Sequence, residues 1–406
     1  GRWSAASELL DGCELLAVQA LLASGERAGA LAEVEDELFR FSQLVASDRQ
    51  LAGALGDWRR PATERAWLVA LDDLPEEYPV DDLLKPVRDG LSHDGTLHAL
   101  PFYAESSMMY YRKDLFEEAG IEISEQPTWE ETREWASKIH DPQAGVAGIC
   151  LRGKPGWGEN MAFVSTLVNT FGGRWFDEQW HPEINSPEWQ EAVSFYVDLL
   201  NQYGPSGATS NGFNENLALF SRGNCGIWVD ATSAAGKLYN PDESQVAEQL
   251  GFAPAPVAKT PKGSHWLWIW ALAIPSSSDS PEAAKEFITW ATSQEYIELV
   301  GETQGWTSAP PGTRESTYAN QNYQQAAPFA DFVLNAIKEA DPDDSTLKPN
   351  PYKGVQLVGI PEFQSIGTQV GQMIAASLAG QRPVEDALNA AQASTERTMQ
   401  RAGYFD

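Results

Sequence analysis

The chain has 406 residues, of which 58 are acidic and 28 are basic, and its formal net charge is −30. A negative field of this size repels nucleic-acid phosphates and anionic lipid headgroups, so neither nucleic acid nor a membrane surface is an expected partner. The length suits two or three domains, and no apolar run reaches the roughly 20 residues that a membrane span needs. No basic segment followed by an apolar one comes after Gly1, so we expect no signal peptide in this chain.

The first 65 residues have the spacing of helices. Their apolar residues recur every three or four positions in two stripes, Leu9, Cys13, Leu16 and Ala20, and then Val34, Leu38, Phe41 and Val45. Pro61 ends the pattern because proline cannot continue the interior of a helix. We therefore expect a helical segment over residues 1–65.

From Ala66 onward, short apolar runs alternate with amphipathic stretches, the pattern of an α/β fold. Strands are predicted over residues 97–103, 107–111 and 225–229. Helices are predicted over residues 113–119, from the N-cap Thr128 to Ile139, from Pro281 through Ala291, from Phe363 to Gly380, and after Pro383. Glu131 lies three residues after Thr128 and completes a capping box.

Three tryptophans alternate in the run from Ser264 to Pro275. The period of two predicts a strand with Trp266, Trp268 and Trp270 on one side. The other side would carry small and aliphatic residues, Leu267, Ile269, Ala271 and Ala273. A row of indoles either packs under a second layer or lines a site for a flat, hydroxylated ligand.

The cysteines and histidines indicate no metal or cofactor. Cys13, Cys150 and Cys225 are widely spaced, and no C-x-x-C pair is present. Cys150 and Cys225 either form a disulfide or stay as buried free thiols. The five histidines have no spacing that would gather a metal ion.

Five motifs resemble, in order, those of the extracellular solute-binding proteins of ABC importers. They lie at residues 97–116, 152–160, 226–232, 264–275 and 354–362. The resemblance covers residues from about 66 to the C-terminus, and it is strongest to the sugar-binding branch with mannitol or sorbitol as ligands. It implies a two-lobe type II periplasmic-binding fold, with residues 66–114 and 262–315 in lobe 1 and residues 115–261 and 316–406 in lobe 2.

The same resemblance implies a function without bond breaking. A protein of this kind captures a sugar alcohol or monosaccharide between its lobes, closes by a hinge motion, and delivers the ligand to the membrane permease. It would act outside the cytoplasm as a monomer and would not be an enzyme.

A different resemblance covers residues 1–65. The stretches 32–41 and 55–62 are similar to part of the delta subunit of rotary ATP synthases, a helical stalk component. The solute-binding family instead begins its first lobe with strand-helix units at this place. We interpret residues 1–65 as part of a fusion of two proteins, or as the product of a misassembled gene or a wrongly assigned N-terminus, and in each case the beginning of lobe 1 is altered.

Binding of a polyol needs carboxylates or amides for its hydroxyls and aromatic rings for its C–H surfaces. In lobe 1 the resemblance places such contacts after a strand, at Glu105 and Ser106 beside Tyr103, and in the tryptophan run at Trp268 or Trp270. An ordinary turn with a solvated acid is the alternative for Glu105.

Lobe 2 supplies the remaining candidates. Trp157, Glu159 and Asn160 lie in a glycine-rich loop that contains no phosphate-binding motif. Trp228 and Asp230 lie at the end of a predicted strand, where open α/β sheets bind ligands, and Asp230 could equally cap the helix that follows. Tyr352 is a further candidate, with an ordinary surface aromatic as its alternative.

Two other functions compete with solute binding. Glu105, Glu159 and Asp230 beside several tryptophans also resemble the cleft of a glycoside hydrolase, which needs two carboxyls about 5–5.5 Å or 6.5–9.5 Å apart. A stalk or scaffold role would instead depend on residues 1–65.

Overall fold

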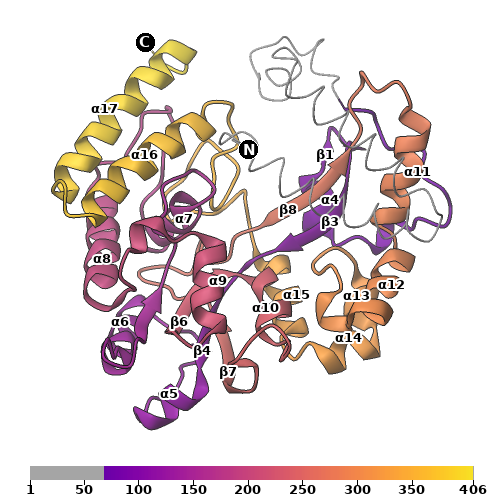
Figure 1. The fold of residues 1–406 in the computed structure, drawn as a ribbon. Helices are drawn as coiled ribbons and strands as arrows, with labels where there is room; N and C mark the ends of the chain where they lie inside the picture. The colour runs from indigo at the N-terminus through magenta and orange to yellow at the C-terminus, as the bar shows by residue number, and fades with distance from the viewer. Residues whose placement is uncertain (1–67, 406) are drawn as a thin grey trace, which may run out of the picture. The chain divides into compact units, whose positions relative to one another are not determined.

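The computed structural model describes residues 68–405, which lie in one compact unit that spans residues 66–406 (Figure 1). The predicted helical segment 1–65 and its stalk-like stretches lie outside the described residues. Within the described residues no helix is long and apolar enough to cross a membrane.

Within residues 68–405, eight strands form three sheets. The strands are β1 (Ser92–His93), β2 (Thr96–Leu97), β3 (Ala99–Glu105), β4 (Ser107–Arg112), β5 (Ala147–Cys150), β6 (Cys225–Ala231), β7 (Leu250–Pro254) and β8 (Trp268–Ala273). β1 pairs with β2 and β3 pairs with β8, both antiparallel. The largest sheet has the order β5-β6-β4-β7, in which β5 and β6 are parallel and β4 is antiparallel to its two neighbours.

Helices surround these sheets. The first group is α4 (Lys85–Gly90), α5 (Lys113–Glu118), α6 (Trp129–Ile139), α7 (Asn160–Thr170), α8 (Pro187–Tyr203), α9 (Phe213–Ser221) and α10 (Ala235–Leu238). The second group is α11 (Pro281–Ala291), α12 (Gln294–Gln304), α13 (Glu315–Ala319), α14 (Gln321–Ala326), α15 (Ala330–Glu339), α16 (Phe363–Leu378) and α17 (Val384–Ala402). Short 3-10 helices are η2 (Val80–Asp82), η3 (Ala208–Ser210), η4 (Thr232–Ala234), η5 (Ala247–Gln249) and η6 (Trp306–Ser308).

Local sequence signals explain several element boundaries. The Thr128 side chain accepts a hydrogen bond from Glu131 N, and the Glu131 carboxylate accepts one from Thr128 N, so the predicted capping box begins α6. α5 ends just before Gly120, whose φ of +62° places it in the left-handed region that glycine tolerates. α17 follows Pro383, as predicted.

The chain passes from one sheet to another at a single residue. β3 ends at Glu105 and β4 begins at Ser107, so Ser106 alone separates the β3-β8 pair from the four-stranded sheet. Ser106 N donates to Thr232 Oγ1 at 3.0 Å, and Thr232 N donates to Ser106 O at 2.8 Å. This crossing fixes Glu105 against the start of η4, at the end of β6.

The tryptophan strand is shorter than predicted. β8 begins at Trp268, so Trp266 precedes it and is held by a 3.3 Å hydrogen bond from its backbone N to Ser107 Oγ. Trp266 is buried with Val355 and Ala231, and Trp268 packs against this cluster. Trp266 is bonded to Ser107 on β4 and lies outside the β3-β8 ladder. Of the three tryptophans, Trp268 and Trp270 therefore share the face of β8.

The apolar core consists of separate clusters. One gathers α6, α7, α8, α16 and α17 around Ile149, Ile227 and Val229, and another packs α9, α13, α14 and α15 with Trp228 and Tyr110. A smaller one joins Leu71, Leu100, Ile274 and Ile288. The residue boundaries of the two lobes stay a prediction. α15, which they assign to lobe 2, contacts α4 and β3, which they assign to lobe 1.

Cys150 and Cys225 form a disulfide, with their Cα atoms 6.2 Å apart. The bridge joins the end of β5 to the beginning of β6, its neighbour in the sheet. Of the two states that the sequence left open, the structure therefore contains the bridged one.

Candidate functional site

The candidate site begins at the antiparallel ladder of β3 and β8. Glu105 lies directly opposite Trp268, and Tyr103 lies opposite Trp270. Opposite residues, and residues two apart on one strand, project from the same face of a sheet. The ladder therefore gathers one carboxylate, one phenol and two indoles on one face, and all four come from predicted site residues.

An aromatic wall (Tyr103, Trp157, Trp268 and Trp270) extends from this face. Tyr103 stacks on Trp270 with 5.7 Å between ring centroids, and Trp268 meets Trp270 edge-on at 5.9 Å. Trp157, from the loop that follows β5, packs against Trp268 with 5.7 Å between the ring centroids. Aromatic rings of this extent offer apolar faces that suit the C–H surface of a carbohydrate.

Asp230 is buried and fully engaged within the protein. Arg152 Nε donates to Oδ2 at 2.9 Å and Arg152 Nη2 donates to Oδ1 at 2.6 Å, a two-point ion pair. Trp228 Nε1 donates to Oδ2 at 3.1 Å, and Ala231 N donates to Oδ1 at 2.7 Å. With 1 % of its surface exposed, Asp230 acts as a holder of Arg152, so the prediction that it contacts ligand directly is not supported.

Arg152 is the residue that the sequence-based prediction missed. Its guanidinium lies 5.3 Å from the centroid of the Phe213 ring and 5.8 Å from that of Trp266, and Nη1 donates to Gly158 O at 2.9 Å. Burial alone would lower the pKa of Arg152, but the charge and hydrogen bonds of Asp230 outweigh it and raise the pKa. A guanidinium has five N–H donors, so donors remain for a ligand after these bonds are made.

Glu105 is a buried carboxyl without a cation of its own. Ser233 Oγ donates a hydrogen bond to Oε2, and none of the described residues forms an ion pair with Glu105. Burial raises the pKa of Glu105 to about 7, an effect that the Ser233 hydrogen bond and Arg152 oppose and that Asp230 increases. The Glu105 carboxyl therefore changes its charge near neutral pH.

The glycine-rich loop places Glu159 and Asn160 in different roles. Glu159 Oε1 lies 3.3 Å from Lys154 Nζ, and its Oε2 is buried without a hydrogen-bond partner among the described residues. Asn160 is fully buried, and both polar atoms of its side chain are bonded within the protein. Oδ1 accepts from Gly156 N at 3.0 Å and Nδ2 donates to Gly371 O at 2.9 Å. Asn160 therefore holds the loop against α16, which does not support its predicted ligand contact.

Two further predicted contacts lie in the core. The Trp228 indole is fully buried and stacks on Tyr110, and its N–H donates a hydrogen bond to Asp230. Tyr352 is buried, accepts a 3.0 Å hydrogen bond from Trp175 N and packs edge-on against Phe176. Neither side chain is presented to a ligand, since both have structural partners at their polar ends.

Five buried polar atoms of the site have no hydrogen-bond partner within the described part of the chain. They are Ser106 Oγ, Glu159 Oε2 and the indole nitrogens of Trp266, Trp268 and Trp270. A buried polar group left unpaired is costly, so native proteins supply a partner from protein, water or ligand. The site therefore offers indole donors and carboxylate acceptors to a molecule that carries both functions.

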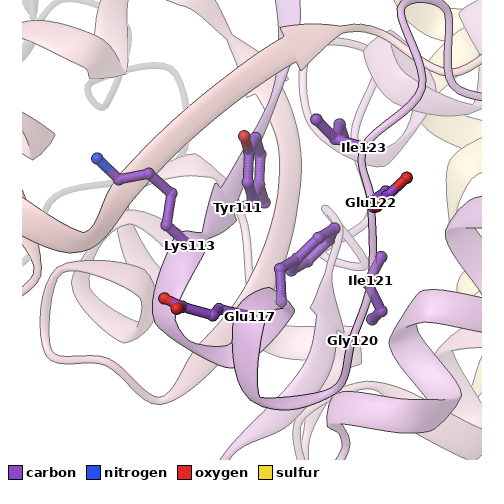
Figure 2. A pocket seen from close by; sticks show the side chains of 8 residues that line it. Tyr111, Lys113, Glu117, Gly120, Ile121, Glu122 and Ile123 are labelled. Atoms are coloured by element: carbon purple, nitrogen blue, oxygen red, sulfur yellow. The ribbon is translucent and has the colours of Figure 1, made fainter.

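A surface hollow of about 390 Å³ lies elsewhere, between α5 and the loop that follows it. Figure 2 shows Tyr111, Lys113, Glu117 and Ile121 around it, and Phe116 is a further lining residue. This hollow contains none of the predicted site residues. Tyr111 and Phe116 form an aromatic pair there, but none of its described lining residues has a buried polar atom without a hydrogen-bond partner, which distinguishes it from the candidate site.

No cluster of three or more histidine, cysteine or acidic side chains within residues 68–405 could hold a metal ion. The hydrolase alternative is also weakened, because Asp230 is neutralised by Arg152 and its oxygens are occupied by donors. A carboxylate bound in this way is a poor base or nucleophile.

The fold and the site define a binding protein, and the chain belongs to the family of bacterial extracellular solute-binding proteins, whose sequence pattern matches residues 43–298. A mannitol-binding protein of Pseudomonas aeruginosa is 57 % identical over 340 residues, which are 84 % of this chain and 78 % of that protein. These relatives are binding proteins, not enzymes.

Solved structures agree with the relatives. An ABC transporter solute-binding protein of Agrobacterium vitis S4 with bound D-mannitol has a TM-score of 0.82 and 58 % identity, covering 84 % of this chain and 82 % of that one. A solute-binding protein of Agrobacterium radiobacter K84 in complex with ribitol has a TM-score of 0.69 and 25 % identity, covering 79 % of this chain and 77 % of that one. They confirm the predicted two-lobe type II fold.

Part of the chain is similar to a protein of another kind. ATP synthase subunit delta of Salinispora arenicola is 60 % identical over 68 residues, which are 17 % of this chain and 25 % of that subunit. The predicted second resemblance is thereby confirmed as a local one.

Proposed function

We propose that this protein is the substrate-binding component of an ABC importer and that it captures an acyclic sugar alcohol, with mannitol as the first candidate. It would work outside the cytoplasm as a monomer and deliver its ligand to the permease subunits. The relatives that bind mannitol and ribitol support the ligand class, and the chemistry of the site supports it independently.

The unpartnered polar atoms of the site carry the proposal. Each hydroxyl of an alditol both donates and accepts a hydrogen bond, so one chain of hydroxyls can accept from the indole N–H groups of Trp268 and Trp270 and donate to Glu105 and Glu159. The remaining N–H groups of Arg152, fixed by Asp230, would bind further hydroxyl oxygens.

The aromatic wall complements these hydrogen bonds. An extended alditol has a C–H edge between its hydroxyls, and this edge would pack against Trp157 and Trp268, whose ring centroids are 5.7 Å apart. Trp157 comes from the loop after β5 and Trp268 from β8, so a ligand held there would bridge segments that the predicted division assigns to different lobes.

The test is a calorimetric and thermal-shift panel of mannitol, sorbitol, arabitol, xylitol and ribitol beside glucose and fructose. We expect mannitol to bind with a measurable heat and to raise the melting temperature. Trp268→Ala should weaken mannitol binding about tenfold or more, corresponding to roughly 1.4 kcal/mol. Trp290→Ala removes an indole on α11 that contacts Phe287 and Tyr296, and it serves as the matched control.

The proposal would be overturned if no alditol produced a heat or a thermal shift with protein that is folded by circular dichroism. Equal loss of mannitol affinity in the Trp268 and Trp290 variants would remove the aromatic wall from the binding site. Light scattering during gel filtration would test the monomeric state.

A further inference from the structure

The charges around the candidate site do not balance. Asp230 is paired with Arg152, and Glu159 lies 3.3 Å from Lys154. Glu105 is the third carboxyl, and within residues 68–405 no basic side chain forms an ion pair with it. When Glu105 is ionised, the site holds one negative charge more than it holds positive charges, in surroundings shielded from water.

The Glu105 carboxyl lies beside indole rings of the aromatic wall. Trp268 lies opposite Glu105 in the β3-β8 ladder, and Trp268 contacts Trp270 edge-on at 5.9 Å. The faces of indole rings attract cations through their negative quadrupole. A cation held by Glu105 would therefore also be favoured by the aromatic rings beside it.

We propose that Glu105 forms a cation-binding subsite, so that this protein takes alditols with a terminal protonated amine alongside neutral alditols and excludes alditol phosphates and sugar acids. The inference rests on the proposed function, because the hydroxyls of the amino-alditol would use the same indole donors and Arg152. The ammonium group replaces one terminal hydroxyl and donates to the Glu105 carboxylate, a charge-assisted hydrogen bond.

The Ser233 hydrogen bond leaves room for this contact. Ser233 Oγ donates to Oε2, which leaves Oε1 to accept from a ligand. Anionic ligands would be repelled from the site. The charge of Arg152 is already neutralised by Asp230, and the ionised Glu105 repels a second anion at close range.

The ionisation of Glu105 makes the binding of an ammonium ligand detectable as a release of protons. The groups whose charges act on it are Arg152 after β5 and Asp230 on β6, and Tyr110 on β4 feels its charge in turn. Burial raises the pKa of Glu105 to about 7, so much of the carboxyl is protonated at pH 6.5. An ammonium ligand binds the ionised form, and its binding must therefore release a proton.

The first experiment uses the unaltered protein and compares mannitol with 1-amino-1-deoxy-mannitol by calorimetry at pH 6.5, in buffers of different ionisation enthalpy. We expect the amine to release more protons than mannitol does, by up to about three quarters of a proton, following the ionisation equilibrium at this pH. We also expect its affinity to fall about tenfold between pH 8 and pH 6, whereas mannitol 1-phosphate shows no binding. Equal proton release for the two ligands would overturn the proposal.

The second experiment compares Glu105→Gln with Glu159→Gln. Glu105→Gln should lower the ratio of amine affinity to mannitol affinity at least about tenfold, the scale expected for a lost charge-assisted contact. Glu159→Gln should lower this ratio less, since Glu159 already has Lys154 beside it. A ratio unchanged by Glu105→Gln would overturn the subsite.

The outcomes separate this inference from the proposed function. If mannitol binds and its amine does not, the subsite is refuted and the proposed function stands. If the amine binds and mannitol does not, the subsite is supported and the ligand class must be revised. If neither binds, both are refuted.

Discussion

The Arg152 guanidinium grips the Asp230 carboxylate at two points, with Nε 2.9 Å from Oδ2 and Nη2 2.6 Å from Oδ1, and both side chains are at least nine-tenths buried. Trp228 and the backbone of Ala231 donate to the same carboxylate. Asp230 therefore fixes the orientation of the guanidinium, and Arg152 is the member of the pair with donors left for a ligand.

The first prediction concerns the stability of this pair. Asp230→Ala leaves Arg152 as a buried, uncompensated charge, so we expect the free energy of unfolding to fall by about 3–5 kcal/mol without any ligand present. Urea denaturation followed by circular dichroism measures this loss. Replacing both residues with apolar ones, Arg152→Met with Asp230→Leu, should recover much of it because no charge stays buried.

A matched control for this prediction is Glu183→Gln, which breaks the pair between Arg174 and the partly exposed Glu183. It should cost clearly less stability, because the glutamine oxygen can still accept a hydrogen bond from Arg174 and Arg174 keeps its bond to Pro349 O. Equal losses for Asp230→Ala and Glu183→Gln would contradict the structural role assigned to Asp230.

The second prediction concerns Gly212, which packs directly against the Glu159 carboxyl. A Cβ at Gly212 would lie 2.8 Å from the carboxyl carbon of Glu159 and would overlap Oε2. Its φ of −99° is open to any residue, so space and not backbone conformation requires glycine here. Gly212→Ala should displace Glu159 and weaken mannitol binding severalfold, as measured by calorimetry.

The control for Gly212→Ala is Gly158→Ala, in the loop that carries Glu159. A Cβ at Gly158 has no neighbouring atom within 4 Å, so this substitution should leave both affinity and stability close to those of the parent. If the two variants bound mannitol equally well, Glu159 would have no part in the site that depends on Gly212.

Much of the fold follows from signals that act within a few residues. The capping box of Thr128 and Glu131 begins α6, and the apolar run after Asn224 forms β6, where the sequence placed them. The resemblance predicts contacts at Tyr103, Glu105, and Trp268 or Trp270, and the β3-β8 ladder places these side chains on one face.

The sequence is least informative where a partner distant in the chain decides a residue's role. Asp230 is 78 residues from Arg152, and no local pattern shows which base a buried acid will pair with. The ligand contacts of Asn160 and Tyr352 stay predictions, and in the structure Gly371 and Trp175 bind polar atoms of these side chains. Arg152 lay inside a recognised motif, and its position next to a glycine-rich loop was the one available signal.

The third prediction concerns the pH dependence of stability. Because burial raises the pKa of Glu105 from 4.5 to about 7, the folded chain binds more protons than the unfolded chain within this window. The contribution of Glu105 to the free energy of unfolding therefore falls as the pH rises from 4.5 to 7, by about 3 kcal/mol in total. Urea denaturation at several pH values, without ligand, should show that Glu105→Gln lacks this decline. Parallel pH profiles for the parent and the variant would contradict it.

The fourth prediction concerns the Cys150–Cys225 bridge, which spans 75 residues of sequence and joins two neighbouring strands. Closing a loop of this length restricts the unfolded chain, so loss of the bridge should lower the free energy of unfolding by up to about 4 kcal/mol. Cys150→Ser with Cys225→Ser should reproduce the effect of a reductant, and the reductant should then have no further effect on the double variant. Because β5 leads into Arg152 and β6 carries Asp230, mannitol affinity should fall together with stability. Peptide mapping without reduction should recover the two cysteines in one linked species, and their recovery as separate free thiols would contradict the bridge.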